Sequence, residues 1–189
     1  MSAHASSIGQ WRHHLWLATL IVVTMAFTLV FACAAPFAAF SAAAALTLSR
    51  RDALLVTVVL WLTNQMTGFI VLNYPWTLNS VAWGPALAVA AILGTLTAQS
   101  IVHRLAESRD VVRALAAFAA AFVVYEVAIF LVSAALLGGV EMFAPAILRQ
   151  VFVTNVAALV GLYGLNWLGA SVGLRRRATV PVSARTASA

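Results

Sequence analysis

Polar side chains that could bind a ligand stand inside long apolar stretches of this sequence. Asn64 and Gln65 are adjacent in one stretch. Glu126 stands in the middle of another, and Arg149 and Asn155 lie in a third. Amides donate and accept hydrogen bonds, a carboxylate accepts them, and a guanidinium pairs with anions. Because polar residues inside a membrane usually face the protein interior and mark a function, these five are candidate substrate-binding residues.

The role of Glu126 has two readings. In the structural reading, it is a protonated acid, or it pairs with Arg149 and links two helices. In the functional reading, it recognises a ligand or relays protons. Arg149 could instead extend outward toward Glu141, and the sequence leaves this choice open.

A loop without charged residues combines aromatic rings with amides and hydroxyls. Its candidate binding residues are Asn73, Tyr74, Trp76, Asn79, Ser80 and Trp83. One reading is an aromatic belt at the membrane interface, with an ordinary turn at Pro75. The other is a lid over an outward-facing pocket, in which the rings cover a ligand and the amides orient it. Helical spacing favours the lid, because one face of the helix before the loop is polar and aromatic and leads into the loop. The residues of this face are Thr57, Trp61, Asn64 and Gly68.

Metal and enzyme chemistry find little support in the sequence. Cys33 is the one cysteine; most lone cysteines in apolar helices are inert, although a thiolate could ligate a metal such as cobalt. The sequence shows no Ser/His/Asp or Cys/His set, no paired carboxylates at one depth and no Gly-rich phosphate loop. We therefore expect no enzyme activity and no resident cofactor.

The composition requires a lipid environment. Of the 189 residues, 63% are hydrophobic and 8% are charged, whereas soluble domains carry about 25% charged residues. All eleven basic residues are arginine, and ten of them fall into four clusters: Arg12, Arg50–Arg51, Arg104–Arg113 and Arg175–Arg185. Arginine accumulates on the cytoplasmic side of membranes, so the clusters predict that both termini are cytoplasmic. Because these residues flank apolar spans instead of forming one basic stripe, we expect no nucleic-acid partner.

The expected fold class is an all-α integral membrane protein with six transmembrane helices, in a bacterial-type inner (plasma) membrane. A cytoplasmic segment (1–14) would precede the membrane domain (15–174), and a disordered cytoplasmic tail (175–189) would follow it. The predicted spans are 15–33, 36–49, 53–72, 81–102, 111–137 and 143–174. Pro36 separates the first two spans, because proline interrupts a helix. Pro36, Pro85 and Pro145 are each expected in the first turn of a span, where proline is tolerated.

The predicted architecture resembles the substrate-binding S-components of energy-coupling-factor vitamin transporters. The stretch Cys33-Ala-Ala-Pro36-Phe-Ala-Ala-Phe40-Ser-Ala-Ala-Ala-Ala45 is similar to the start of the second helix in that family. The resemblance implies a vitamin bound near the outer face, with cobalamin as the first candidate, and transmembrane and ATPase subunits as partners. The matching positions would be the turn 33–36, the loop 73–80 with Trp83, and Glu141 with Arg149. Span 1 departs from the family, because it has Thr24 and Thr28 where an Ala-x-x-x-Ala contact for the transmembrane partner is often found.

Three functions are therefore compatible with the sequence. The first is a vitamin-binding uptake subunit whose ligand lies under the loop 73–84. The second is a proton-coupled or facilitative carrier centred on Glu126. The third is a membrane scaffold subunit without a small ligand, held to a partner through small-residue helix faces.

Overall fold

The computed structural model describes residues 11, 14–23, 26 and 35–171, and all regular structure in this part of the chain is helical. A short helix, His14–Val23, comes first. The following elements are α2 (Phe37–Thr47), α3 (Arg50–Met66), the π-helix η1 (Thr67–Val71), α4 (Leu78–Arg104), α5 (Asp110–Val132), the π-helix η2 (Ser133–Leu137), the 3-10 helix η3 (Val140–Phe143) and α6 (Pro145–Ser171). The predicted all-helical class is confirmed for the described residues.

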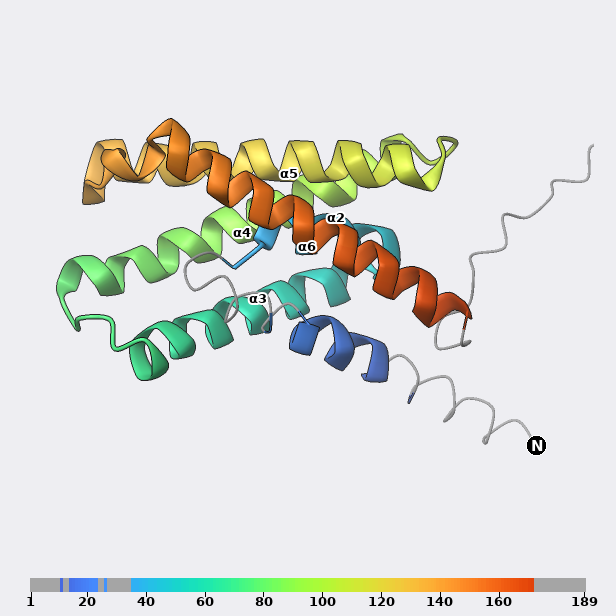
Figure 1. The fold of residues 1–189 in the computed structure, drawn as a ribbon, viewed down its shortest axis with the longest axis horizontal. Coiled ribbons are helices and arrows are strands. Elements are labelled where there is room, and N and C mark those ends of the chain that lie inside the picture. Colours follow the sequence, from blue (N-terminus) through green and yellow to red (C-terminus); the bar gives the residue numbers. More distant parts are fainter. Residues whose placement is uncertain (1–10, 12–13, 24–25, 27–34, 172–189) are drawn as a thin grey trace, which may run out of the picture.

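Helices α3 to α6 run in alternating directions and form the body of the molecule (Figure 1). In the described part of the chain, four helical segments are long and apolar enough to cross a membrane: Arg50–Val71, Leu78–Arg104, Asp110–Leu137 and Pro145–Leu168. Between 17% and 33% of each such window is buried within the protein. Because so much apolar surface stays uncovered, this is a membrane-embedded protein.

The predicted first and second spans differ from these four helices. Helix α2 has 11 residues and is about 16 Å long, roughly half of a ~30 Å hydrocarbon core. It therefore cannot cross a bilayer by itself. The helix His14–Val23 covers the start of the predicted first span, and the rest of that span, with Cys33, lies outside the described residues. Six crossings therefore remain a prediction.

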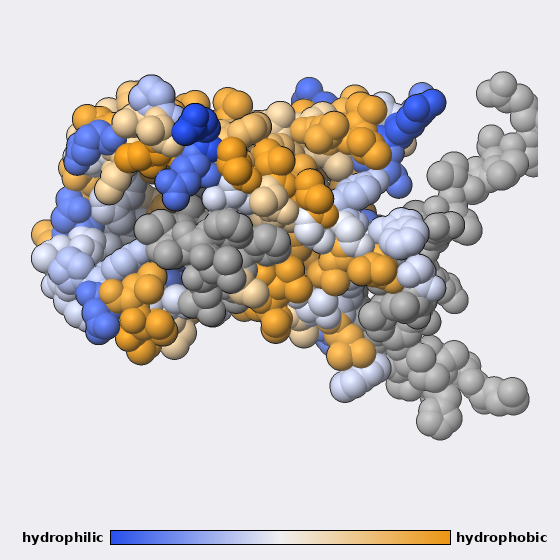
Figure 2. All heavy atoms as spheres, in the orientation of Figure 1, coloured by the Kyte–Doolittle hydropathy of each residue, from blue (hydrophilic) through white to orange (hydrophobic). Residues whose placement is uncertain are grey.

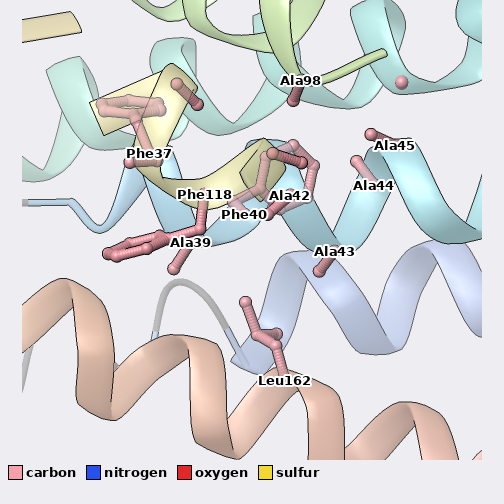
Figure 3. Packing of buried hydrophobic residues seen from close by; sticks show 14 of the residues in the cluster. Phe37, Ala39, Phe40, Ala42, Ala43, Ala44, Ala45, Ala98, Phe118 and Leu162 are labelled. Atoms are coloured by element: carbon pink, nitrogen blue, oxygen red, sulfur yellow. The ribbon is translucent and has the colours of Figure 1, made fainter. Parts of the chain in front are cut away.

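Helix α2 is the centre of the hydrophobic core. All nine residues from Phe37 to Ala45 are buried. They pack against α4, α5 and α6, with Ala98, Phe118 and Leu162 among the contacting side chains (Figure 3). A helix that is apolar on every side is expected to be buried, and its alanines allow the neighbouring helices to approach closely.

The N-terminus of α2 is capped by a different helix. Pro36 occupies the N-cap position and provides no side-chain hydrogen bond. The Asn155 Oδ1 atom of α6 accepts a hydrogen bond from the Ala39 backbone N–H at 3.3 Å. The Asn155 Nδ2 atom donates to the Val151 carbonyl at 3.0 Å. Asn155 therefore satisfies a helix N–H that would otherwise be unpaired in the core.

Three buried hydroxyls connect α2, α3 and α4. The Thr95 Oγ1 atom lies 3.0 Å from Ser41 Oγ and 2.9 Å from Thr57 Oγ1, and Thr57 also donates to the Ala53 carbonyl. On the same helix as Thr95, Gly94 faces α5: a Cβ added there would be in van der Waals contact with the Ala121 carbonyl oxygen, at 3.5 Å. These contacts fix α2 between its neighbours.

Two long helices begin earlier than the sequence predicts. Helix α3 starts at Arg50, because Ser49 caps it: the Ser49 Oγ atom accepts from the Asp52 N–H and donates to the Asp52 carboxylate. Helix α4 starts at Leu78, where Thr77 accepts from the Ser80 N–H. Pro85 consequently lies inside α4, and its expected place in a first turn is wrong.

The described arginine clusters lie at one end of the bundle. This arginine end contains the start of α3, the end of α4 and the start of α5 (Figure 1). The connections from α3 to α4 and from α5 to α6 lie at the opposite end. Apolar residues cover much of the surface between the ends, and hydrophilic residues concentrate toward them (Figure 2). This arrangement is typical of a membrane-spanning bundle.

Candidate functional site

A cavity of about 250 Å³ lies between α3 and α4 near the end opposite the arginine end. Ten residues line this α3–α4 pocket: Asn64, Gln65, Thr67, Gly68, Phe69, Leu72, Tyr74, Ser80, Trp83 and Leu87. Five of them are predicted binding residues: Asn64, Gln65, Tyr74, Ser80 and Trp83. The lining contains no charged side chain.

Two half-buried amides in the pocket have no hydrogen-bond partner among the described residues. Within the part of the chain that the structure describes, neither Asn64 nor Gln65 forms a side-chain hydrogen bond. By contrast, Thr67 donates to the Thr63 carbonyl at 2.9 Å, and Ser80 shares a 2.9 Å hydroxyl contact with Thr77. The donors and acceptors of the two amides are therefore available to a ligand.

The ring of Tyr74 packs directly on the backbone of Gly68. A Cβ added at Gly68 would lie 2.9 Å from the Tyr74 Cδ2 atom, which is closer than real Cβ contacts. The Tyr74 N–H also donates to the Gly68 carbonyl at 3.0 Å. Only glycine lets the ring occupy this position, so Gly68 shapes the pocket wall.

A π-helical turn brings the chain from α3 into this wall. Helix η1 follows α3 directly. At its end, the Leu72 N–H donates a hydrogen bond to the Thr67 carbonyl at 3.0 Å. Asn73 then adopts a left-handed backbone conformation with φ of 53°, which asparagine tolerates better than most residues. Turns of this π type are frequent at functional sites.

The other wall of the pocket comes from α4. The Trp61 indole N–H of α3 donates to the Gly84 carbonyl at 2.8 Å and fastens the two helices together. A Cβ added at Gly84 would lie 3.4 Å from Gln65 Oε1, so glycine leaves room for that amide. The side chain of Trp83 reaches the α5–α6 connection, because its Cζ2 atom is 4.0 Å from a Cβ added at Gly139.

The remaining loop residues lie outside the pocket. Trp76 is 76% exposed and stacks on Phe69 with ring centroids 4.5 Å apart. The Asn79 Nδ2 atom donates to the Leu137 carbonyl at 2.8 Å and joins the start of α4 to the end of η2. The Asn73 Nδ2 atom donates to the Val71 carbonyl at 3.4 Å. These three residues lie outside the pocket, and the predicted loop contributes Tyr74, Ser80 and Trp83 to the lining.

Glu126 and Arg149 belong to a separate feature. Both line an open groove of about 400 Å³ between α5 and α6, together with Phe122, Val123, Val127, Leu148 and Phe152. Val123, Val127 and Phe152 are exposed, so this α5–α6 groove opens on the outside of the bundle. Within the described residues, no ion pair joins Arg149 to Glu126 or to Glu141.

The predicted set of binding residues therefore divides into four places. Five residues line the α3–α4 pocket, three loop residues (Asn73, Trp76 and Asn79) lie outside it, two line the α5–α6 groove, and Asn155 is buried beside α2. The sequence reasoning did not select the pocket residues Thr67, Phe69, Leu72 and Leu87. It did place Gly68 on a polar face with Asn64, and that spacing was the available signal for the pocket wall.

No cluster of three or more metal-ligating side chains is present among the described residues. Cys33, the candidate cobalt ligand, lies outside them. The α3–α4 pocket itself contains amides, hydroxyls and aromatic rings. This chemistry suits hydrogen bonding and stacking.

Searches against protein families, curated proteins and solved structures gave no significant match to this chain. The resemblance to vitamin-transporter S-components therefore remains a prediction.

Proposed function

We propose that this protein is a membrane-embedded substrate-binding subunit for uptake of a vitamin or a related micronutrient, and that its ligand occupies the α3–α4 pocket. One observation carries the proposal: Asn64 and Gln65 present unpaired amides to a cavity inside a membrane domain. Unsatisfied polar groups are costly at such depth unless they serve a ligand or water.

The position of the pocket supports uptake. It lies near the end opposite the described arginine clusters, and arginine favours the cytoplasmic side. In the proposed orientation, both termini are cytoplasmic, the membrane is a bacterial-type inner membrane, and the pocket opens on the outer side. A ligand could then reach it before crossing.

The resemblance to S-components supplies the proposed partners. Such a subunit would bind its ligand and depend on transmembrane and ATPase subunits for energy. Among vitamins, cobalamin is a large macrocycle with a nucleotide loop, and a cavity of about 250 Å³ would have to widen greatly to hold it. The pocket volume therefore favours a smaller vitamin over cobalamin.

Native mass spectrometry of the gently purified protein tests the proposal. We expect a small molecule to copurify with the wild type and to be lost in Asn64→Leu and Gln65→Leu. Gln150→Leu is the matched control, because Gln150 is an exposed amide on α6, outside the pocket. A ligand-free chain bound to a stoichiometric protein partner would instead indicate the scaffold function.

A further inference from the structure

We propose that the α3–α4 pocket selects uncharged, planar ring compounds that carry a neighbouring hydrogen-bond donor and acceptor, and that it rejects the corresponding carboxylates. Carboxamides, cyclic imides and cyclic ureas have such an edge. This inference rests on the proposed function, because it assumes that the pocket is a ligand site.

The charge of the lining supports a neutral ligand. None of the ten lining residues is acidic or basic. The ionisable residues Glu126 and Arg149 line the separate α5–α6 groove, on different helices. An ionic ligand would lose hydration in the pocket without gaining a counter-charge, which is unfavourable in an apolar environment.

The two free amides support a ligand with both a donor and an acceptor. Each side-chain amide has an NH₂ group that donates and a carbonyl oxygen that accepts. An amide-like edge on the ligand can satisfy both groups of Asn64 or Gln65. A carboxylate can only accept, so it would leave the carbonyl oxygen of its partner unpaired.

The shape of the cavity supports a flat ligand. Three aromatic side chains, Phe69, Tyr74 and Trp83, contribute to the lining. The Tyr74 ring is seated on Gly68, and aromatic rings favour stacking or edge contacts with another ring. The volume of about 250 Å³ lies just below the ~300–1,000 Å³ of drug-sized sites, so a ligand with one or two rings fits best.

Equilibrium dialysis with matched ligand pairs tests the inference. Purified protein in lipid nanodiscs is dialysed against an equimolar mixture of nicotinamide and nicotinate, 6-methyluracil and orotate, and benzimidazolone and benzimidazolone-5-carboxylate. The pairs cover a carboxamide, a cyclic imide and a cyclic urea, each with an anionic counterpart. Retained compounds are measured by mass spectrometry for the wild type, Gln65→Leu and the control Gln150→Leu.

We expect at least one neutral member to be retained about tenfold over its anionic partner, corresponding to ~1.4 kcal/mol. Gln65→Leu should lose this retention, and Gln150→Leu should keep it. If the wild type retains an anionic member and Gln65→Leu does not, the proposed preference for neutral ligands is wrong, but the pocket is still a binding site. If the wild type retains none of the six compounds, the ligand class is overturned. The copurification experiment above then decides separately whether the proposed function survives.

Discussion

Asn155 shows how a polar residue in a membrane helix can serve the fold. Its Oδ1 atom accepts from Ala39 and its Nδ2 atom donates to Val151, so both groups of the side chain are used within the protein. The residue is 3% exposed. The structure gives Asn155 a capping role, and its predicted ligand contact stays a prediction.

We expect Asn155→Leu to lower the free energy of unfolding by about 1–3 kcal/mol, because the Ala39 N–H loses its buried acceptor. Unfolding in detergent measures this change. Asn155→Asp retains an acceptor oxygen and is the control for hydrogen bonding. If Asn155→Leu leaves stability unchanged and abolishes ligand binding, the residue belongs to the binding site after all.

Gly68 offers a test of the pocket wall. We expect Gly68→Ala to weaken ligand binding about tenfold, because the added Cβ would displace the Tyr74 ring at 2.9 Å. Stability should not fall in parallel, since alanine is favoured over glycine in helices by about 1 kcal/mol. Copurified-ligand occupancy and the unfolding temperature are measured on the same samples.

Gly164→Ala on α6 is the matched control, because nothing lies within 4 Å of a Cβ added there. Equal losses of binding in both variants would show that the effect does not come from the pocket wall.

At the scale of the helices, the sequence predicted the positions of the long spans and of α2, but it did not predict that α2 is buried in the protein core. Four long apolar helices lie close to their expected positions, because a run of about 20 apolar residues has few alternatives to a membrane span. Helix α2 has the same composition but is buried by protein. Apolar composition does not distinguish burial in lipid from burial in a core.

The candidate site was predictable only where neighbouring residues share a helix or a turn. Asn64 and Gln65 could be placed beside Tyr74, because α3 leads through η1 into the loop. Arg149 could not be excluded from the same site, because that exclusion depends on how α5 and α6 pack. Such contacts between distant segments are absent from a single sequence.

The α5–α6 groove gives a test at the same scale. We expect Glu126→Gln to leave ligand affinity unchanged within about twofold, because Glu126 does not line the α3–α4 pocket. Titration of the purified protein with its copurified ligand measures the affinity. Gln65→Leu serves as the positive control for loss of binding.

Uptake by cells that carry Glu126→Gln distinguishes the vitamin-binding uptake subunit from the proton-coupled carrier. If binding persists but uptake fails and no longer depends on the pH gradient, the proton-coupled carrier is the better description of this protein.

For the whole molecule, the central structural fact is that α2 reaches only part of the way through the bundle. Its last residue, Thr47, is followed closely by the start of α3 at the arginine end. Its first turn, about 16 Å away, meets Asn155, which lies ten positions beyond Pro145 in α6. Helix α2 therefore packs the half of the bundle nearer the arginine end, and the α3–α4 pocket lies toward the other half.

The position of the arginine end predicts how the protein is oriented in the membrane. If the arginine end is cytoplasmic, the connection between α4 and α5 must face the cytoplasm, and the connection between α5 and α6 must face outward. With Cys33 replaced by alanine, Glu107→Cys and Met142→Cys place one thiol at each exposed connection. In intact cells, a membrane-impermeant maleimide should label Met142→Cys at once, but Glu107→Cys only after permeabilisation. The reverse pattern would put the pocket on the cytoplasmic side, where it could release or sense a ligand but could not capture one for uptake.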